Sequence, residues 1–383
     1  MTSHRRLRST ARPPLEDEDL LSEVLLRLPS QPSSLPRASL VCNPWRSLVA
    51  DPGFLRRFRL HHRRNAPLLG FFDISYAEGS FHDIYFVPTM DRPNRLPDGP
   101  EGRFYLPAAN REEGYRELLG CRDGLVLILH LPWRCPRRTP PASWRPILVW
   151  DPVSGDKHRI AFPWGFDDYK LLQWWINGAV LRHAGLDHFH VILLVTEEGK
   201  ENRRLLAWVY SSETSEWGDP ISTLLPSWDF LSNPDKPAVL AENSLYWILV
   251  EDGGLGFLFL LKWDYRAVFY DWKTDRDGVS SWVNSKVIEI DKLLSLNAEK
   301  KYELLCKNLN KECTRMLGFA ENSNVIFLET FIGLFMIELS TLQLKELPRT
   351  NGHRFNVHAF ESVYTAGTGI GGGHGGAEVL RNA

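Results

Sequence analysis

The sequence predicts a small N-terminal helical unit followed by a larger, antiparallel all-β unit. Helical periodicity is confined to residues 13–60, whereas aromatic and β-branched runs between turn residues fill most of the rest. The charge balance changes at the same place. Residues 1–64 contain 12 arginines, no lysine and six acidic residues, a net charge of +6, and the remainder has a net charge of −8. At 383 residues the chain exceeds the usual size of one domain, which also indicates two folding units.

The composition excludes several classes of protein. With 43% hydrophobic and 24% charged residues, wholesale disorder is excluded. The longest apolar runs, such as Gly256–Leu261, are much shorter than the roughly 20 residues that cross a bilayer, so we expect no membrane span. The five cysteines form no close pair and no Asn-x-Ser/Thr acceptor is present, which favours a reducing compartment. We therefore expect the protein in the nucleus, the cytoplasm or both.

Both ends of the chain are predicted to be tails. Residues 1–12 carry four arginines without a following apolar core, which predicts a disordered basic tail; an organellar transit peptide is the alternative. Residues 366–383 are rich in glycine, and Gly367, Gly369 and Gly372 have the spacing of a dinucleotide-binding fingerprint. Too few residues follow to build the helix and second strand that this motif requires, so we predict a flexible tail.

Residues 15–28 predict an amphipathic helix. Leu20, Leu21, Val24, Leu25 and Leu28 form one broad apolar face. Four acidic residues at positions 16–19 complement the positive end of the helix dipole, and the proline at position 29 ends the helix.

Three shorter helices are predicted to follow. The segment 35–42 has a short apolar stripe, and Asn43-Pro44 and Asp51-Pro52 each combine an N-cap residue with a proline at the first helical position. A unit of this size has too thin a core to be stable alone. Some of its apolar side chains should therefore be covered, either by a partner or by the larger unit, and the periodicity favours neither.

The same residues resemble an F-box. The resemblance covers residues 13–60 in order and with the spacing of that family, and the motifs that carry it are Asp19-Leu-Leu-x-Glu-Val-Leu25, Arg27-Leu-Pro29, Arg37-Ala-Ser-Leu-Val-Cys42, Trp45-Arg46 and Asp51-Pro-x-Phe54-x-x-Arg57-Phe58. In that family the helices dock on a Skp-type adaptor, which links the protein to the cullin and RING subunits of a ubiquitin ligase. Two residues depart from the family pattern, Glu16 and Pro44, and neither is expected to prevent docking.

The resemblance implies an adaptor-binding surface. Its members are Leu15, Leu20, Leu21, Val24, Leu28, Leu35, Val41, Cys42, Trp45 and Leu48.

After residue 65 a pattern of three short strands recurs. A turn of Asp or Asn with Gly or Ser opens an apolar strand, a second strand ends in a polar turn, and a third strand follows. The four copies begin at residues 123, 177, 243 and 322, at intervals of 54, 66 and 79 residues. These intervals are compatible with a kelch-like repeat of about 50 residues with insertions, and such repeats build a β-propeller. Residues 66–121 would supply one or two further sheets, and a β-sandwich is the alternative.

Residues 66–365 also resemble, piecewise, the C-terminal F-box-associated domain of plant F-box proteins, especially those of the large grass families. The residues that carry this likeness are Cys121-Arg-Asp-Gly-Leu-Val126, Val149-Trp-Asp-Pro-x-Ser-Gly155, Val209-Tyr-Ser-Ser-Glu-Thr214, Ala241-Glu-Asn-Ser-Leu-Tyr-Trp247 and Ala320-Glu-Asn-Ser-Asn-Val-Ile-Phe-Leu328. The resemblance implies a domain that recruits a target protein, and it does not identify the target.

No set of residues predicts a catalytic site or a cofactor. A Gly-x-Ser-x-Gly elbow, a Gly-Lys-Ser/Thr phosphate loop and a His-Glu-x-x-His helix are all absent from the sequence. His183, His188 and His190 lie close enough in sequence to share a metal, but a fixed fourth ligand is missing, and solvent-facing histidines are favoured. The basic run 56–64 suggests nucleic-acid binding or nuclear import; we favour the solvated face of a helix with Phe54, Phe58 and Leu60 turned inward.

These observations together predict a non-catalytic substrate-recognition subunit of a Skp–cullin–F-box ubiquitin ligase. The adaptor would bind within residues 15–58, and an unknown target protein would bind the β domain. We expect no cofactor, no bound metal, and neither a nucleic acid nor a membrane as a partner. Two alternatives stay open: an F-box binding protein that acts outside a ligase, and a propeller enzyme with a metal near His183–His190.

Overall fold

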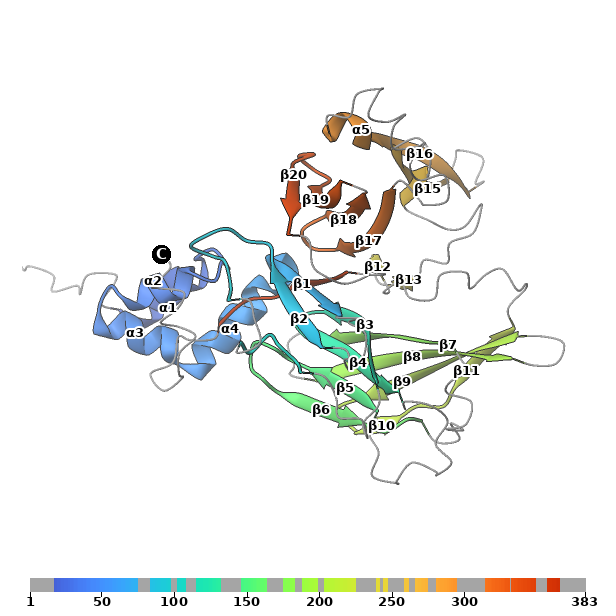
Figure 1. The fold of residues 1–383 in the computed structure, drawn as a ribbon. Coiled ribbons are helices and arrows are strands. Elements are labelled where there is room, and N and C mark those ends of the chain that lie inside the picture. Colours follow the sequence, from blue (N-terminus) through green and yellow to red (C-terminus); the bar gives the residue numbers. More distant parts are fainter. Residues whose placement is uncertain are drawn as a thin grey trace, which may run out of the picture. The chain divides into compact units, whose positions relative to one another are not determined.

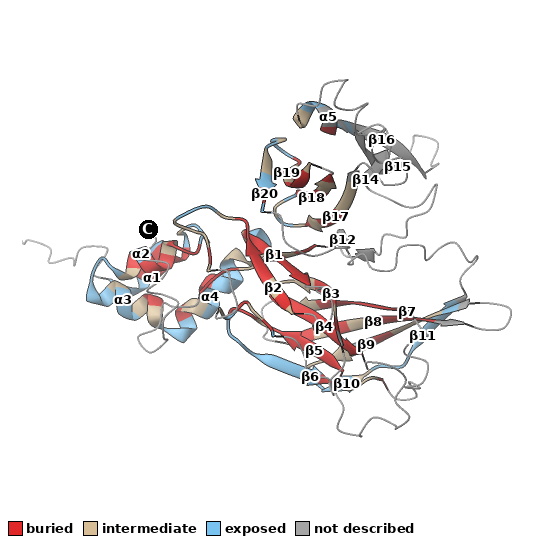
Figure 2. Ribbon diagram, viewed as in Figure 1, coloured by how far each residue is buried: buried red, intermediate tan, exposed pale blue. Residues whose placement is uncertain are grey.

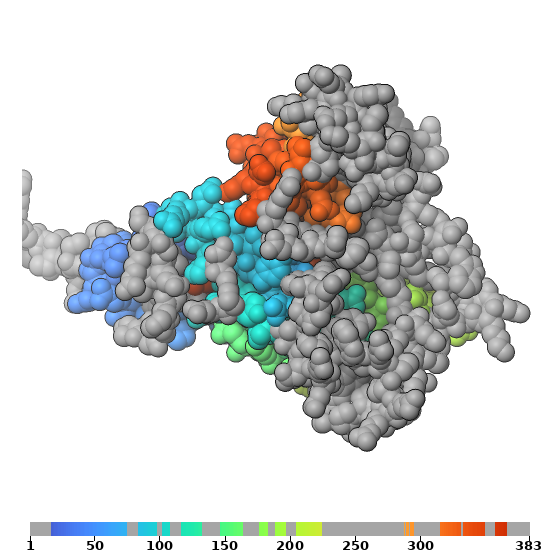
Figure 3. All heavy atoms as spheres, in the orientation of Figure 1, coloured from blue at the N-terminus to red at the C-terminus, as the bar shows by residue number. Residues whose placement is uncertain are grey.

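The computed structural model divides the chain into two compact units. The helical unit comprises residues 1–67, 91–96 and 363–383, and the β unit comprises residues 68–90 and 97–362. Figure 1 draws the described residues in colour, and Figure 3 shows as coloured spheres those whose side chains are described. The described residues are 17–74, 83–97, 102–107, 115–131, 146–163, 175–182, 188–198, 203–224, 239–241, 244–246, 258–261, 266–274, 280–294, 314–330, 332–348 and 357–365.

Four α-helices make up most of the described helical unit. They are α1 (Glu18–Leu26), α2 (Ser34–Ser39), α3 (Asn43–Ala50) and α4 (Pro52–His62), and a 3-10 turn (Arg63–Asn65) follows. Two of the helices begin at an aspartate whose carboxylate accepts hydrogen bonds from free backbone amides of the first turn. Asp51 was predicted as a cap and is one, whereas α3 begins one residue earlier than predicted, with Cys42 as its N-cap.

The core of the helical unit includes a residue from the far end of the chain. Its buried members are Leu21, Leu25, Leu26, Leu35, Ala38, Val49, Phe54, Phe58, Ala66 and Val363. Near Val363, the Arg59 guanidinium donates a 3.0 Å hydrogen bond to the Thr365 hydroxyl. The loop 91–96 also takes part, because the Asn94 amide oxygen accepts hydrogen bonds from the backbone N–H (3.2 Å) and hydroxyl (2.7 Å) of Ser33. The helical unit is therefore completed by two segments that the sequence prediction assigned to the β region.

The described strands of the β unit form six antiparallel sheets. In chain order the strands are β1 (Leu68–Ile74), β2 (Ile84–Pro88), β3 (Tyr115–Arg122), β4 (Leu125–Leu131), β5 (Ile147–Trp150), β6 (Lys157–Ile160), β7 (Trp175–Arg182), β8 (Phe189–Glu198), β9 (Arg203–Ser211), β10 (Glu216–Trp217), β11 (Ile221–Leu224), β12 (Val239–Ala241), β13 (Ser244–Tyr246), β14 (Leu258–Leu261), β15 (Arg266–Thr274), β16 (Ser280–Glu289), β17 (Thr314–Ala320), β18 (Val325–Thr330), β19 (Gly333–Glu338), β20 (Leu344–Leu347) and β21 (His358–Glu361). A short helix, α5 (Ile290–Leu293), follows β16.

The order of the strands in the described sheets is consistent with propeller-like sheets. Five of the six sheets contain only strands that are near neighbours in sequence, such as β3-β4-β5-β6 and β17-β18-β19-β20. The remaining sheet, β2-β1-β21, pairs the first strand of the unit with the last one, with Phe72 opposite His358. Strands of different sheets also touch, because β3 contacts both β21 and β7, and β17 contacts both β14 and β21. The fold-class prediction is confirmed: N-terminal helices precede an all-antiparallel β region (Figure 1).

The predicted repeat begins one strand too late in two of the sheets. The Asp123-Gly124 turn joins the first and second strands of its sheet, and both residues have positive φ, 53° and 75°. Asn324, with φ of 52°, lies in the corresponding turn between β17 and β18. Asn177, however, was predicted to open a strand and instead lies buried inside β7, opposite Leu194. The predicted start at residue 243 lies outside the described residues.

In chain order the first sheet is β2-β1-β21, the second is β3-β4-β5-β6, and the third contains β7 to β11. Apolar side chains fill the spaces between these three sheets. One cluster joins β3, β4 and β5 to β7, β8 and β9, with Leu127, Val191 and Trp208 among its members. On the other side of the second sheet, the ring of Trp150 lies 5.5 Å from that of Phe72 on β1. Figure 2 shows β4 and β5 buried along their length, while the outer strand β6 is largely exposed. The second sheet is therefore covered on both faces and open at its outer edge.

Candidate adaptor-binding surface

Two exposed apolar side chains lie on one side of α1. Leu20 and Val24 keep 51% and 47% of their surface exposed, and their spacing of four residues places them on the same side of the helix. Leu21 and Leu25, which follow each of them by one residue, are buried in the helical core. The broad apolar face predicted for this helix is therefore two faces, one that packs inside the unit and one that meets solvent.

A second exposed apolar pair follows α2. Leu40 and Val41 are 60% and 61% exposed, and Cys42 beside them is an exposed free thiol. The predicted stripe assumed that the helix continues to Cys42, whereas α2 ends at Ser39 and the chain turns. Leu40 was not among the predicted surface residues, and its only sequence signal is its place in an apolar run after a short helix. We call Leu20, Val24, Leu40 and Val41 the exposed apolar pairs.

The remaining predicted surface residues lie deeper in the helical unit. Leu21 and Leu35 are buried, with exposed fractions of 3% and 1%. Leu28, Trp45 and Leu48 are partly buried and pack against the same core. In the free chain these five residues therefore hold the helices together. Leu15 lies outside the described residues, and direct adaptor contact of any of these side chains stays a prediction.

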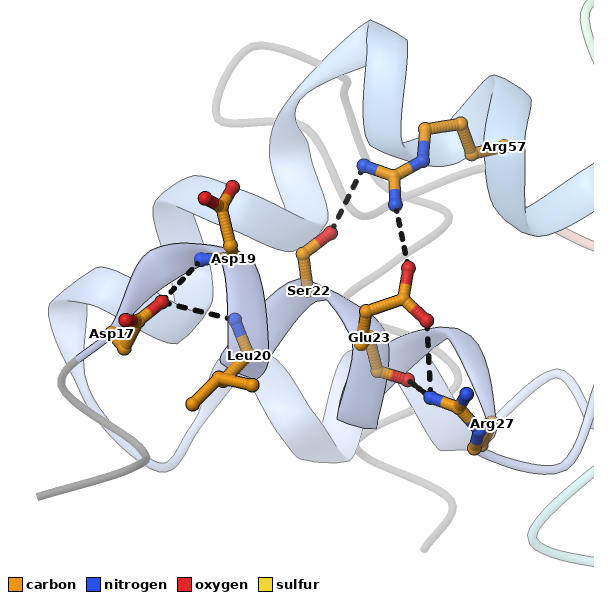
Figure 4. Close-up of polar contacts among 7 residues, drawn as sticks. All are labelled: Asp17, Asp19, Leu20, Ser22, Glu23, Arg27 and Arg57. Carbon is orange, nitrogen blue, oxygen red and sulfur yellow. Dashed lines mark hydrogen bonds and ion pairs between the residues drawn. The ribbon is translucent and has the colours of Figure 1, made fainter.

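Polar contacts fix α1 against α4 on a different side from Leu20 (Figure 4). Glu23 accepts a 3.1 Å hydrogen bond from Arg27, the residue that follows α1, and a 3.2 Å hydrogen bond from Arg57 on α4. The guanidinium of Arg57 also donates to the Ser22 hydroxyl, at 3.2 Å. Because Glu23, Arg27 and Arg57 are about half exposed or more, each pair contributes at most about 1 kcal/mol, so their main effect is on orientation. At the start of α1, the Asp17 carboxylate accepts hydrogen bonds of 3.1 Å from the backbone N–H groups of Asp19 and Leu20.

The basic run on α4 is the solvated face of a helix, with one exception to the prediction. Phe54 and Phe58 are buried in the helical core as expected. Leu60 was predicted to face inward, but it is 41% exposed. His62 lies against Phe58, with ring centroids 4.5 Å apart, and its Nε2 lies 2.8 Å from the Leu26 carbonyl oxygen. Burial lowers the pKa of His62 despite that hydrogen bond, so the neutral imidazole is favoured.

The alternative of a metal enzyme gains no support from the part of the chain that the structure describes. His183 lies outside it, and the described side chains include no group of three or more His, Cys, Asp or Glu residues placed to hold a metal ion. Among the described helices, none has the length and apolar character that a transmembrane span requires.

Comparison with known proteins identifies a known domain within the helical unit. Residues 17–57 match the family model of the F-box domain. A curated F-box protein of Arabidopsis thaliana is 23% identical over 231 residues, which cover 60% of this chain and 53% of the relative, so the chain spans about half the length of that protein. A crystal structure of the WD40 domain of SCAP from fission yeast aligns over 78% of this chain and 54% of its own, with 12% identity and a TM-score of 0.20. The helical unit therefore carries an F-box domain at residues 17–57, and the Arabidopsis protein is a distant relative of the chain.

Proposed function

We propose that this protein is a substrate-recognition subunit of a Skp–cullin–F-box ubiquitin ligase. The helical unit would bind a Skp-type adaptor, and through it the cullin and RING subunits, while the β unit would bind a target protein. The chain would supply no chemistry of its own, because holding a target next to the transfer machinery accelerates the reaction by proximity. We propose that it acts in the nucleus, the cytoplasm or both.

The exposed apolar pairs are the observation that carries this proposal. These four aliphatic side chains are about half exposed or more, although the described helices of the unit have a buried core of their own. Each exposed apolar pair favours association with an apolar partner, at about 25 cal/mol for each Å² removed from water. They lie within the residues that match the F-box domain. The predicted docking surface thus divides into outer residues that would touch the adaptor and inner residues that shape the helices.

Co-purification tests the proposal. The full chain is mixed with a Skp-type adaptor and a cullin, beside the variants Leu20→Asp/Val24→Asp and Leu60→Asp. Burying two carboxylates against an apolar partner costs several kcal/mol, so the double variant should lose the adaptor and the cullin together. Leu60→Asp places one carboxylate on another exposed leucine of the same unit and should retain both.

The other outcomes separate the alternatives. Retention of the adaptor without the cullin would favour a binding protein that acts outside a ligase. Failure of the folded wild type to retain any adaptor would contradict the proposal. A Leu21→Asp variant is no test of docking, because its carboxylate would enter the helical core and unfold the unit.

A further inference from the structure

The outer strand of the second sheet, β6, carries exposed positive charge, and one of its edges is open among the described strands. Strand β6 pairs with β5 on one side, and no described strand pairs with its other side. Lys157, His158 and Arg159 are all exposed, in contrast to the buried strands behind them (Figure 2). Neither Lys157 nor Arg159 forms an ion pair or side-chain hydrogen bond with any described residue. The edge therefore offers two exposed cations without a partner among the described residues, on a unit with an excess of acidic residues.

The backbone N–H and C=O groups of Lys157 and Arg159 also face away from β5. The backbone N–H of Asp151 donates to the Asp156 carbonyl oxygen at 2.9 Å, and Val149 lies opposite His158. In an antiparallel ladder the hydrogen-bonding groups of successive residues alternate between the two sides of a strand. Residues 156, 158 and 160 therefore face β5, and the N–H and C=O groups of Lys157 and Arg159 face the open side.

The face of the sheet that bears these side chains is apolar and buried on the inner strands, and it carries Lys157 and Arg159 at its exposed edge. Register places Lys157 opposite Trp150 and Arg159 opposite Leu148, and the same face continues to Arg116 and His130 on β3 and β4. No acidic residue occurs on this face among the described strand residues of the sheet. The nearest carboxylate along β6, that of Asp156, lies before the strand and accepts a 2.7 Å hydrogen bond from the Ser154 hydroxyl. The exposed Lys157 and Arg159 therefore give this edge a positive potential that favours an acidic ligand.

We propose that β6 is a docking edge for an extended acidic segment of a target protein, which adds to the second sheet as an antiparallel fifth strand. Glutamates two residues apart on such a segment project to one face with a spacing of about 7 Å, which matches Lys157 and Arg159. The segment's backbone would bond to the outward N–H and C=O groups of those two residues. This inference rests on the target-binding role proposed for the β unit, and it does not depend on the adaptor.

Peptide binding to the full chain tests the inference. The probe is a fluorescein-labelled dodecapeptide in which Glu alternates with Thr, and fluorescence polarisation measures its binding. The peptide should bind, and its affinity should fall as salt is added because the contacting charges are exposed. A matched peptide with Gln in place of every Glu should bind at least tenfold more weakly. Equal binding of the two peptides would overturn the inference.

Two comparisons locate the site. Lys157→Glu/Arg159→Glu should weaken binding at least tenfold, whereas Arg204→Glu, which changes an exposed arginine on β9, should leave it unchanged. N-methylation of the Glu amides should abolish binding, and N-methylation of the Thr amides should not, because only the Glu residues lie opposite the outward-facing groups of β6. Binding that survives the charge reversal or the Glu methylation would overturn the docking edge. Adaptor retention is measured on the same variants. If they retain the adaptor but the peptide result contradicts the docking edge, only the inference about β6 fails, and the ligase proposal stands.

Discussion

At the scale of single residues, His130 shows how the second sheet accommodates an ionisable group in its interior. Its side chain is 2% exposed, it lies opposite Arg116 on β3, and its Nε2 has no hydrogen-bond partner among the described groups. Burial lowers the pKa of His130 to about 3, with further lowering by the charges of Arg116 and Arg159. The folded protein therefore holds this imidazole neutral.

A neutral buried histidine makes stability depend on pH. In the unfolded chain the imidazole takes up a proton below its ordinary pKa of 6.5, whereas in the folded protein it does so only near 3, so stability is lost as the pH falls through that interval. Between pH 7.5 and 5.0 this group should cost about 2 kcal/mol of unfolding free energy. Urea unfolding followed by tryptophan fluorescence measures it, since 13 of the 14 tryptophans follow residue 67. The variant His130→Gln should lose about 2 kcal/mol less over the same range, and an unchanged pH dependence would contradict the assignment.

The residue pattern predicted that α1 has an apolar face, but it did not predict which residues of that face are buried. Leu20, Leu21, Val24 and Leu25 fit one helical face, because a face of 100° or more accepts two adjacent residues in each turn. The structure divides them since the core that they pack on includes Phe54, Phe58 and Val363, whose positions follow from tertiary contacts. A sequence window around α1 contains no information on those contacts, so Leu21 and Leu20 look equivalent until the fold is known.

At the scale of elements, β17 makes a close approach that only glycine permits. The register with β18 shifts between Met316 and Gly318, and next to that shift the backbone N–H of Val357 donates to the Leu317 carbonyl oxygen at 3.0 Å. A Cβ atom on Gly318 would overlap the carbonyl oxygen of Val357. This contact lies just before β21, where the chain returns to pair with β1.

The substitution Gly318→Ala should therefore weaken the packing of Val357 against β17 and lower the stability of the β unit. Backbone cannot move aside as a flexible side chain can, so we expect a loss of at least about 2 kcal/mol of unfolding free energy. Gly218→Ala is the matched control, because its Cβ would meet only the Val209 carbonyl oxygen at an ordinary 3.5 Å. Thermal unfolding of the two variants measures the difference. Equal melting temperatures would show that the segment before β21 is not packed as described.

The strand pattern predicted sheets, but it missed strands without a turn residue at their start. Strands β4, β5 and β6 fall within the first predicted repeat, and β18, β19 and β20 fall within the last. The first strand of each of these sheets, β3 and β17, was absent from the predicted repeat because no Asp/Asn-Gly/Ser turn precedes it. Pairing of β1 with β21 joins residues nearly 300 positions apart, and no local pattern contains such a partner.

At the scale of the whole molecule, the chain connects its two units more than once. It passes from the helical unit to the β unit after Pro67 and returns after Ser362, with the loop 91–96 as a further excursion. The strands at those two junctions, β1 and β21, pair with each other. Both ends of the β unit thus meet in one sheet, and the C-terminal end goes on to contribute Val363 to the helical core.

The surface around α1 and the end of α2 that we propose binds a Skp-type adaptor includes Cys42, whose thiol can report on adaptor binding without any substitution. This thiol is exposed and lies beside Val41, whereas burial raises the pKa of the Cys121 thiol and slows its reaction. The measurement is the rate of Cys42 alkylation by iodoacetamide in the full chain, resolved by mass spectrometry, with and without saturating adaptor and with glutathione as a reference thiol. We predict that the adaptor slows alkylation of Cys42 at least tenfold. An unchanged rate would contradict this proposal.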